Sequence, residues 1–283
     1  MLLFLAAIVA AFWYLRVEEA DREQEALRRD VEYAQQRVRL RLLERQEQLM
    51  RVARDLANKD MELPQFHQRA ESLIGQYPEL QAITWIDESG KVLASHATPT
   101  IASAQVRVAG EVLRKGDTQT GFALSRSTQQ PVYSQPALKE GEPAPLLQLQ
   151  VPLNAQGNFA GVVLGEYSVD NLLRYGTPTE VQARYAVTLL DADNRVLAGT
   201  PLLGREGAAS VLPWSRTGSQ YEVPVAPVGN SLVFRAQAYQ TSLGLIGSGL
   251  FWMVSILSAL TAAPACHISE SRISLSSALS FSL

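Results

Sequence analysis

Hydrophobic and polar residues follow two different periods along this chain. Residues 16–59 are dense in charge and contain no Gly or Pro, and apolar side chains recur there every three or four residues. This spacing is typical of an amphipathic helix. The apolar stripe consists of Leu27, Val31, Ala34, Val38, Leu42, Leu49, Val52 and Leu56, and Arg45 takes its one polar position. The pattern therefore predicts a single helix, roughly 60 Å long at 1.5 Å per residue.

A helix of this length has consequences for assembly. One small domain cannot cover the whole stripe, so part of it should pack along two modules or against a second chain. We expect a parallel homodimer through this helix. The alternative is a solvated helix without a partner, because some of the apolar positions are only Ala.

After a helix-like stretch at 64–77, the pattern changes to a period of two. "AITWIDESGKVLASH" (82–96) indicates two strands joined by a turn at 88–90. Residues 104–115 look helical again. Four strand-like segments follow, "GFALSR" (121–126), "PVYSQPAL" (131–138), "LLQLQVPL" (146–153) and "FAGVVLGEYSV" (159–169), and "NAQGN" (154–158) predicts a hairpin between the last two. The order predicts an α+β fold.

The chain repeats one motif. "ITWIDESGKVLAS" (83–95) returns as "VTLLDADNRVLAG" (187–199), and "QYEVPVAP" with "SLVFRAQAYQ" predicts a further hairpin across 228–230. We therefore expect two related antiparallel-sheet modules, a larger one at 60–178 and a smaller one at 179–242. Asp87 and Asp191 stand at the same place in both copies. An Asp before a turn can accept hydrogen bonds from backbone amides two residues on, so we interpret both as structural.

Both ends of the chain are apolar. Residues 1–15 and 243–263 are rich in hydrophobic side chains, and the second stretch has the length of a membrane-spanning helix. We expect two transmembrane helices, the first of them shortened at its start. A buried core helix at each end is the alternative. The Ser-rich tail, 264–283, shows no periodic core and suggests a truncated or frameshifted reading frame. The one cysteine, Cys266, lies in this tail, so the middle of the chain can form no disulfide.

Charge and motifs exclude several functions. A net charge of −3 and a pI near 5.7 give no basic surface for nucleic acid. The sequence contains no Gly-rich phosphate loop, no His pair at metal-ligand spacing and no Gly-x-Ser-x-Gly elbow. We expect neither catalysis nor a cofactor or metal ion.

The order of these features resembles a known family. The chain looks like the double Cache sensor region of bacterial sensor histidine kinases and chemoreceptors. It shares with that region an apolar anchor, a long helix, two PAS-like sheets opened by the repeated hairpin, and a second apolar segment. "VPLNAQGNFAGVVLGEYSVDNLL" (151–173) carries the most specific part of the resemblance, since Cache modules end with a Pro-containing strand, a hairpin, a Gly-Val-Val strand and a short helix.

The resemblance implies a non-catalytic function. We expect an extracytoplasmic region, 16–242, that senses a small molecule at the bacterial inner membrane, and an intact relative would carry a cytoplasmic histidine kinase. The alternative is a membrane-anchored interaction protein whose modules bind another protein. A polar pocket in the larger module would favour the first function, and a cavity closed by apolar side chains the second.

Four residues of the larger module are candidates for the ligand site. Trp85 stands where the second copy has Leu189, although core packing beside Ile83 is the favoured explanation for this residue. Arg126 and Tyr133 flank "STQQP", and Arg126 could bind a ligand carboxylate through two hydrogen bonds. Glu166 lies where the resemblance implies an acid for a ligand amine. Because no Trp follows Arg126, a dicarboxylate or another small anion fits as well as an amino acid.

Overall fold

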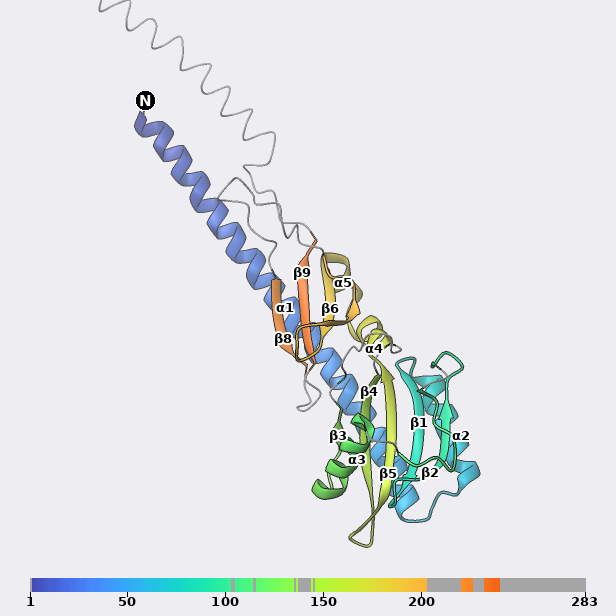
Figure 1. Ribbon diagram of the computed structural model, residues 1–283. Helices are drawn as coiled ribbons and strands as arrows, with labels where there is room; N and C mark the ends of the chain where they lie inside the picture. The colour runs from blue at the N-terminus through green and yellow to red at the C-terminus, as the bar shows by residue number, and fades with distance from the viewer. Residues whose placement is uncertain are drawn as a thin grey trace, which may run out of the picture. The chain divides into compact units, whose positions relative to one another are not determined.

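The structure is a computed structural model and describes residues 2–102, 105–113, 116–134, 136, 144, 146–202, 220–225 and 232–239. One long helix, two antiparallel sheets and four shorter helices make up these residues (Figure 1). The predicted mixture of helix and antiparallel sheet is confirmed at this level. No helix in the described part of the chain is both long enough and apolar enough to span a bilayer. The second predicted span, 243–263, and the tail lie outside the described residues.

The long helix is α1 (Leu2–Ala57), which covers the predicted segment, 16–59, except for its last two residues. Every apolar residue of the stripe between Leu27 and Leu56 is at most 6% exposed. Their side chains belong to one core that also includes residues of both sheets. The stripe is therefore covered within the chain and leaves no surface for a partner. A second helix would have to contact the other face of α1, where Tyr33 and Leu40 are 56% and 62% exposed.

The first sheet has five strands in the order β2-β1-β5-β4-β3, and all of its pairs are antiparallel. Its strands are β1 (Leu80–Asp87), β2 (Val92–Ala97), β3 (Val132–Tyr133), β4 (Leu146–Ala155) and β5 (Asn158–Ser168). The predicted helix before it is confirmed as α2 (Leu63–Gln76). The β4–β5 hairpin turns at Gln156 and Gly157, which both have positive φ, and this confirms the turn predicted from "NAQGN".

Two predictions within this region are wrong. Residues 121–126, expected to be a strand, lie in α3 (Asp117–Thr128). In a strand, the side chains of Phe122 and Leu124 would point to the same face. In the helix, Phe122 is buried together with Ser125, and Leu124 is 48% exposed. The helix expected at 104–115 is also absent from the described part of that segment, 105–113, which holds turns and an isolated bridge from Lys91 to Val112.

The second sheet has four strands in the order β7-β6-β9-β8. They are β6 (Tyr185–Leu190), β7 (Val196–Gly199), β8 (Gln220–Pro224) and β9 (Val233–Ala238). Both predicted pairings, β6 with β7 and β8 with β9, are confirmed, while the turn at 228–230 lies outside the described residues. Two short helices, α4 (Val169–Gly176) and α5 (Thr179–Arg184), connect β5 to β6.

The two copies of the repeated motif share their geometry. The pairing register shifts between Trp85 and Ile86 in the first hairpin, and at the equivalent place after Leu189 in the second. Oδ1 of Asp87 accepts backbone N–H groups of Ser89 and Lys91 at 2.8 and 2.9 Å. Oδ1 of Asp191 does the same at 2.8 Å for residues 193 and 195. Each Asp therefore holds its own turn, as expected for a structural residue.

Candidate ligand-binding site

The two faces of the five-stranded sheet differ in chemistry. Side chains alternate along a strand, so successive residues of β4 and β5 point to opposite sides. On one side Leu147, Leu149 and Tyr167 join the core that includes α1. On the other side the strands carry Gln148, Gln150 and Glu166, all in partly or fully buried surroundings. The face away from α1 thus carries a row of polar side chains, next to a smaller buried apolar cluster that includes Val162, Leu164 and Phe122.

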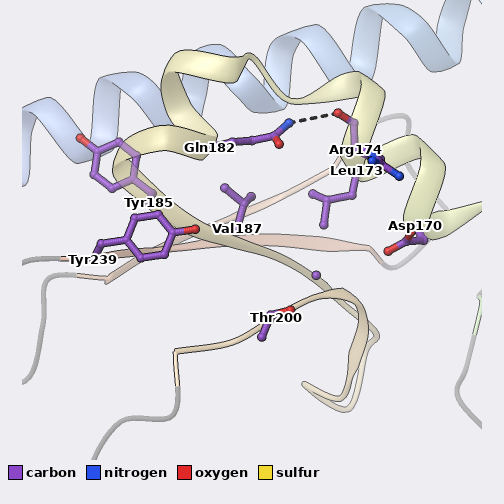
Figure 2. A pocket seen from close by; sticks show the side chains of 9 residues that line it. Asp170, Leu173, Arg174, Gln182, Tyr185, Val187, Thr200 and Tyr239 are labelled. Atoms are coloured by element: carbon purple, nitrogen blue, oxygen red, sulfur yellow. Dashed lines mark hydrogen bonds between the residues drawn. The ribbon is translucent and has the colours of Figure 1, made fainter.

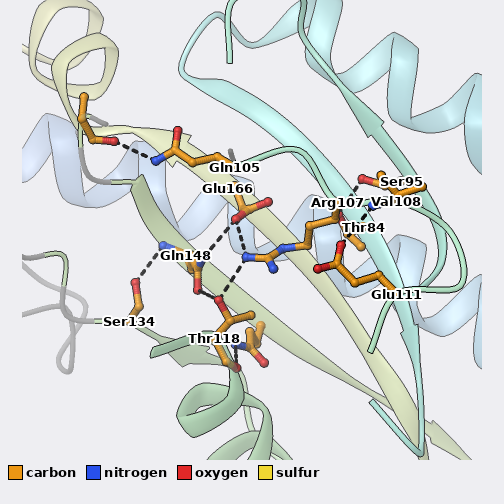
Figure 3. Close-up of polar contacts among 12 residues, drawn as sticks. Thr84, Ser95, Gln105, Arg107, Val108, Glu111, Thr118, Ser134, Gln148 and Glu166 are labelled. Atoms are coloured by element: carbon orange, nitrogen blue, oxygen red, sulfur yellow. Dashed lines mark hydrogen bonds and ion pairs between the residues drawn. The ribbon is translucent and has the colours of Figure 1, made fainter. Parts of the chain in front are cut away.

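Five side chains gather on this polar face, and we call them the polar cluster: Arg107, Thr118, Gln148, Gln150 and Glu166 (Figure 3). Arg107 Nη2 donates to Glu166 Oε1 at 3.1 Å and to Thr118 Oγ1 at 3.0 Å. Gln148 Nε2 donates to the same Glu166 oxygen at 3.0 Å. Gln150 Nε2 donates to the backbone oxygen of Thr118 at 2.8 Å, which fixes the start of α3 over the sheet.

Three polar atoms of the cluster keep unused hydrogen-bonding capacity. Glu166 Oε2, Arg107 Nε and Gln150 Oε1 are buried and have no hydrogen-bond partner among the described residues. A buried polar atom without a partner costs free energy comparable to a lost hydrogen bond. Glu166 Oε2 can therefore accept a further hydrogen bond, and Arg107 Nε can donate one.

Burial controls the ionisation of Glu166. Its side chain is 1% exposed, whereas that of Arg107 is 19% exposed. Burial raises the pKa of Glu166, and the charge of Arg107 and the hydrogen bonds from Arg107 and Gln148 offset only part of this effect. A second positive charge at Oε2 would favour the carboxylate, so a cationic group suits this position.

The structure does not bring the four predicted site residues together. Glu166 belongs to the polar cluster. Trp85 lies on the opposite face of the sheet, where its ring is 6.0 Å from that of Phe66. Tyr133 is also on that face, and its hydroxyl donates to the backbone oxygen of Leu42 in α1 at 3.3 Å.

Arg126 lies apart from all three. It is an exposed residue of α3, with its guanidinium carbon 5.7 Å from the ring centre of Phe159. The arginine that contacts Glu166 is Arg107, which sequence reasoning did not single out. A signal was present in β4, because Gln148 and Gln150 interrupt an apolar strand at a spacing of two. No such signal marks Arg107, which a loop carries to the sheet.

The cluster does not form a metal site. It offers one carboxylate, and within the described ranges no three His, Cys, Asp or Glu side chains gather in a way that could hold a metal ion. The cluster combines one carboxylate, one guanidinium, one hydroxyl and two amides, and this set of groups is suited to hydrogen bonding with a polar small molecule.

The fold is shared with ligand-binding domains of bacterial chemoreceptors. The ligand-binding domain of the Pseudomonas aeruginosa amino acid chemoreceptor PctB, in complex with L-Gln, is similar with a TM-score of 0.54 and 16% identity, over 84% of this chain and 98% of that domain. That of the Pseudomonas fluorescens chemoreceptor CtaA, in complex with L-alanine, has a TM-score of 0.52 and 14% identity over 77% and 98%.

A third similar structure is an extracellular ligand binding receptor from Desulfohalobium retbaense, with a TM-score of 0.55 and 15% identity over 75% of this chain and 40% of the receptor. No protein-family description and no curated protein matches this chain. At these identities the likeness concerns the fold, and it agrees with the resemblance to Cache sensor regions read from the sequence.

Proposed function

We propose that this chain is the extracytoplasmic input region of a bacterial membrane signal-transduction protein, and that it senses a small molecule at the polar cluster. The first module, 60–178, holds the site, and the second, 179–242, lies between it and the predicted second anchor. The fold of chemoreceptor ligand-binding domains supports sensing. A histidine kinase as the output domain rests on the sequence resemblance.

One observation carries the choice of site. Glu166 Oε2 and Arg107 Nε are buried in the same cluster, and neither atom has a hydrogen-bond partner in the part of the chain that the structure describes. A ligand with an ammonium group and a carboxylate would satisfy both, since the ammonium donates to Glu166 and the carboxylate accepts from Arg107. The similar domains contain L-Gln and L-alanine, which have this pair of groups. We therefore propose a small zwitterion as the ligand.

The polar character of the cluster also separates the two candidate functions. A module that binds only another protein gains nothing from a buried ion pair with unused hydrogen-bonding capacity, because buried polar groups cost free energy unless they are hydrogen-bonded. The interaction-protein alternative predicts that this face of the sheet closes over apolar side chains. Part of the face does so, around Val162, Leu164 and Phe122, but the neighbouring part presents Gln148, Gln150 and Glu166, and this polar part supports sensing.

Ligand binding to the purified full chain tests the proposal. L-glutamine, L-alanine, succinate and ethylamine are compared by thermal shift and calorimetry. A compound that binds should stabilise the fold by about 2.7 kcal/mol at a hundredfold excess over its Kd. The zwitterions should bind more tightly than succinate or ethylamine, each of which satisfies only one free atom.

Variants then locate the site. Glu166→Gln removes the negative charge that the ammonium group would contact, and Arg107→Lys keeps the positive charge but removes the Nε–H donor. Each should weaken binding by roughly tenfold or more. Arg126→Ala is the matched control, because Arg126 is an exposed arginine of the same module. Loss of binding in Arg126→Ala alone would instead restore the carboxylate anchor predicted from the sequence. Absence of binding for all four compounds would favour the interaction-protein function.

A further inference from the structure

A groove lies in another part of the molecule, where α4 and α5 meet β6 and β7 (Figure 2). Its volume is about 370 Å³, within the range of small-molecule sites. No residue of the polar cluster lines it. The groove is therefore separate from the polar cluster, and the site proposed there does not account for it.

The floor of the groove is apolar. Leu173, Tyr185 and Val187 contribute to it, and each is between 7% and 9% exposed. The Tyr185 hydroxyl donates to Asp30 Oδ2 at 3.1 Å, so its ring is the part that remains available to a ligand. Tyr239 adds a second aromatic ring, 52% exposed, at the same end of the groove (Figure 2).

Gly199 keeps this floor open. It lines the groove with φ of +85°, and a Cβ at this position would overlap the backbone oxygen of Val187. The same Cβ would lie 2.9 Å from Leu173 Cδ2, which is closer than real side chains approach one another. Any larger residue at 199 would therefore displace the floor.

The wall formed by α4 and α5 is fixed before any ligand arrives. Gln182 Nε2 donates to the backbone oxygens of Arg174 and Thr177 at 3.0 and 2.9 Å. These bonds satisfy carbonyl groups at the end of α4 and tie the two helices together. A groove with a fixed wall loses little conformational freedom on binding.

The other end of the groove carries charges of both signs. Asp170 and Arg174 stand one helical turn apart on α4, opposite the tyrosines (Figure 2). Both are exposed, and neither side chain has a hydrogen-bond or ion-pair partner among the described residues. Each also suits the dipole of its helix end. At the mouth of an apolar groove, these two charges are also placed to bind charged groups of a ligand.

We propose that this groove is a second binding site, for a small zwitterion that carries an aromatic or branched apolar group. The apolar group lies over Leu173 and Val187 beside the two tyrosine rings. The carboxylate binds the Arg174 guanidinium, and the ammonium binds the Asp170 carboxylate. This site does not depend on the function proposed for the polar cluster.

Equilibrium dialysis of the purified full chain with labelled L-phenylalanine tests the site. Arg174→Ala and Tyr239→Ala should each weaken binding by about tenfold or more, because they remove the carboxylate contact and one ring. Arg195→Ala and Tyr175→Ala are the matched controls, since both residues are exposed on the same part of the chain and do not line the groove. The controls should bind as the wild type does.

Two further comparisons decide the outcome. Phenylacetate and phenethylamine each lack one charge, so both should bind more weakly than L-phenylalanine. Glu166→Gln should leave phenylalanine binding at the groove unchanged. Loss of binding in Glu166→Gln, with Arg174→Ala unaffected, would place the ligand at the polar cluster and overturn the second site while supporting the first. Absence of saturable binding by the wild type would also overturn it.

Discussion

Arg45 Nε donates to Glu79 Oε1 over 3.0 Å, and both side chains are buried, at 8% and 0% exposed. Arg45 occupies the one polar position in the apolar stripe of α1. Its guanidinium carbon also lies 3.5 Å from the ring centre of Tyr77. The second Glu79 oxygen is 3.5 Å from Arg41. The interruption of the stripe is therefore the point at which α1 is joined electrostatically to the turn that leads into β1.

Breaking this pair should destabilise the protein strongly. Arg45→Ala leaves Glu79 with only the longer contact to Arg41, and Glu79→Ala leaves Arg45 with only Glu44 at 3.2 Å. We therefore expect losses of up to about 3–5 kcal/mol in the free energy of unfolding, measured by urea denaturation. Arg51→Ala, which removes one member of an exposed pair with Glu47, should cost about 0–0.5 kcal/mol. Similar losses in Arg45→Ala and Arg51→Ala would contradict the importance of burial.

Some of this architecture could be predicted from the sequence, and the rest could not. Local periodicity identified α1, both copies of the hairpin and the turn at Gly157, because each depends on residues close together in the chain. The partner of Arg45 stands 34 residues away, and only the fold joins them. Arg107 and Glu166 are 59 residues apart, so no local pattern could pair them. The strand predicted at 121–126 failed because a short segment of mixed residues fits both periods.

The two turn aspartates should contribute to stability and not to binding. Asp87→Ala and Asp191→Ala each remove the acceptor of two backbone N–H groups, so we expect losses of about 1 kcal/mol in chemical denaturation. Asp193→Ala, an exposed residue of the second turn, is the control. Unchanged stability together with lost ligand binding in Asp87→Ala would show that the first hairpin belongs to the site.

Asp87 also makes stability depend on pH. Burial acts to raise its pKa, but hydrogen bonds from Ser89 and Lys91 outweigh this and lower it below the ordinary value. The stabilisation is therefore present above the ordinary aspartate pKa and is lost as the pH falls through the lowered one. The difference in unfolding free energy between wild type and Asp87→Ala should shrink in acid.

Glu166 should show the opposite dependence. Because burial raises its pKa, the folded protein holds this proton more tightly than the unfolded chain does. Relative to Glu166→Gln, the wild type should be most stable below the ordinary glutamate pKa, and should lose stability as the pH rises through the raised pKa. Urea denaturation of both proteins between about pH 4 and pH 8 measures this. A relative stability that increases with pH would mean that Arg107 outweighs burial.

Two glycines of one hairpin should respond differently to alanine. At Gly161, φ is +130° and a Cβ would overlap the backbone oxygen of Ile86, whereas at Gly157, with φ of +84°, the space is open. Gly157→Ala should cost about 1–2 kcal/mol from backbone strain alone. Gly161→Ala should cost clearly more, because β1 and β5 must also separate locally. Thermal unfolding of the two variants makes the comparison, and equal costs would exclude the steric contribution.

The expected homodimer can now be tested at a defined surface. Since the stripe of α1 is buried within the chain, a parallel dimer through α1 would use the face of Tyr33 and Leu40. Leu40→Glu should then shift the full chain from dimer to monomer in sedimentation experiments, because it places a charge in the interface. Val108→Glu, at a residue 64% exposed elsewhere, should not. A monomeric wild type at high concentration would exclude this dimer.

The alternation of side chains along β5 has a mechanical consequence. Glu166 faces the polar cluster, and the next residue, Tyr167, is buried on the opposite side beside the charges of Arg45 and Glu79. A rotation of this strand about its axis that follows a change at Glu166 would therefore move Tyr167 in the opposite sense against α1, and a sliding of the strand would move both residues together. The side chain that contacts the polar cluster and the side chain that contacts the helix core are thus separated by a single peptide unit.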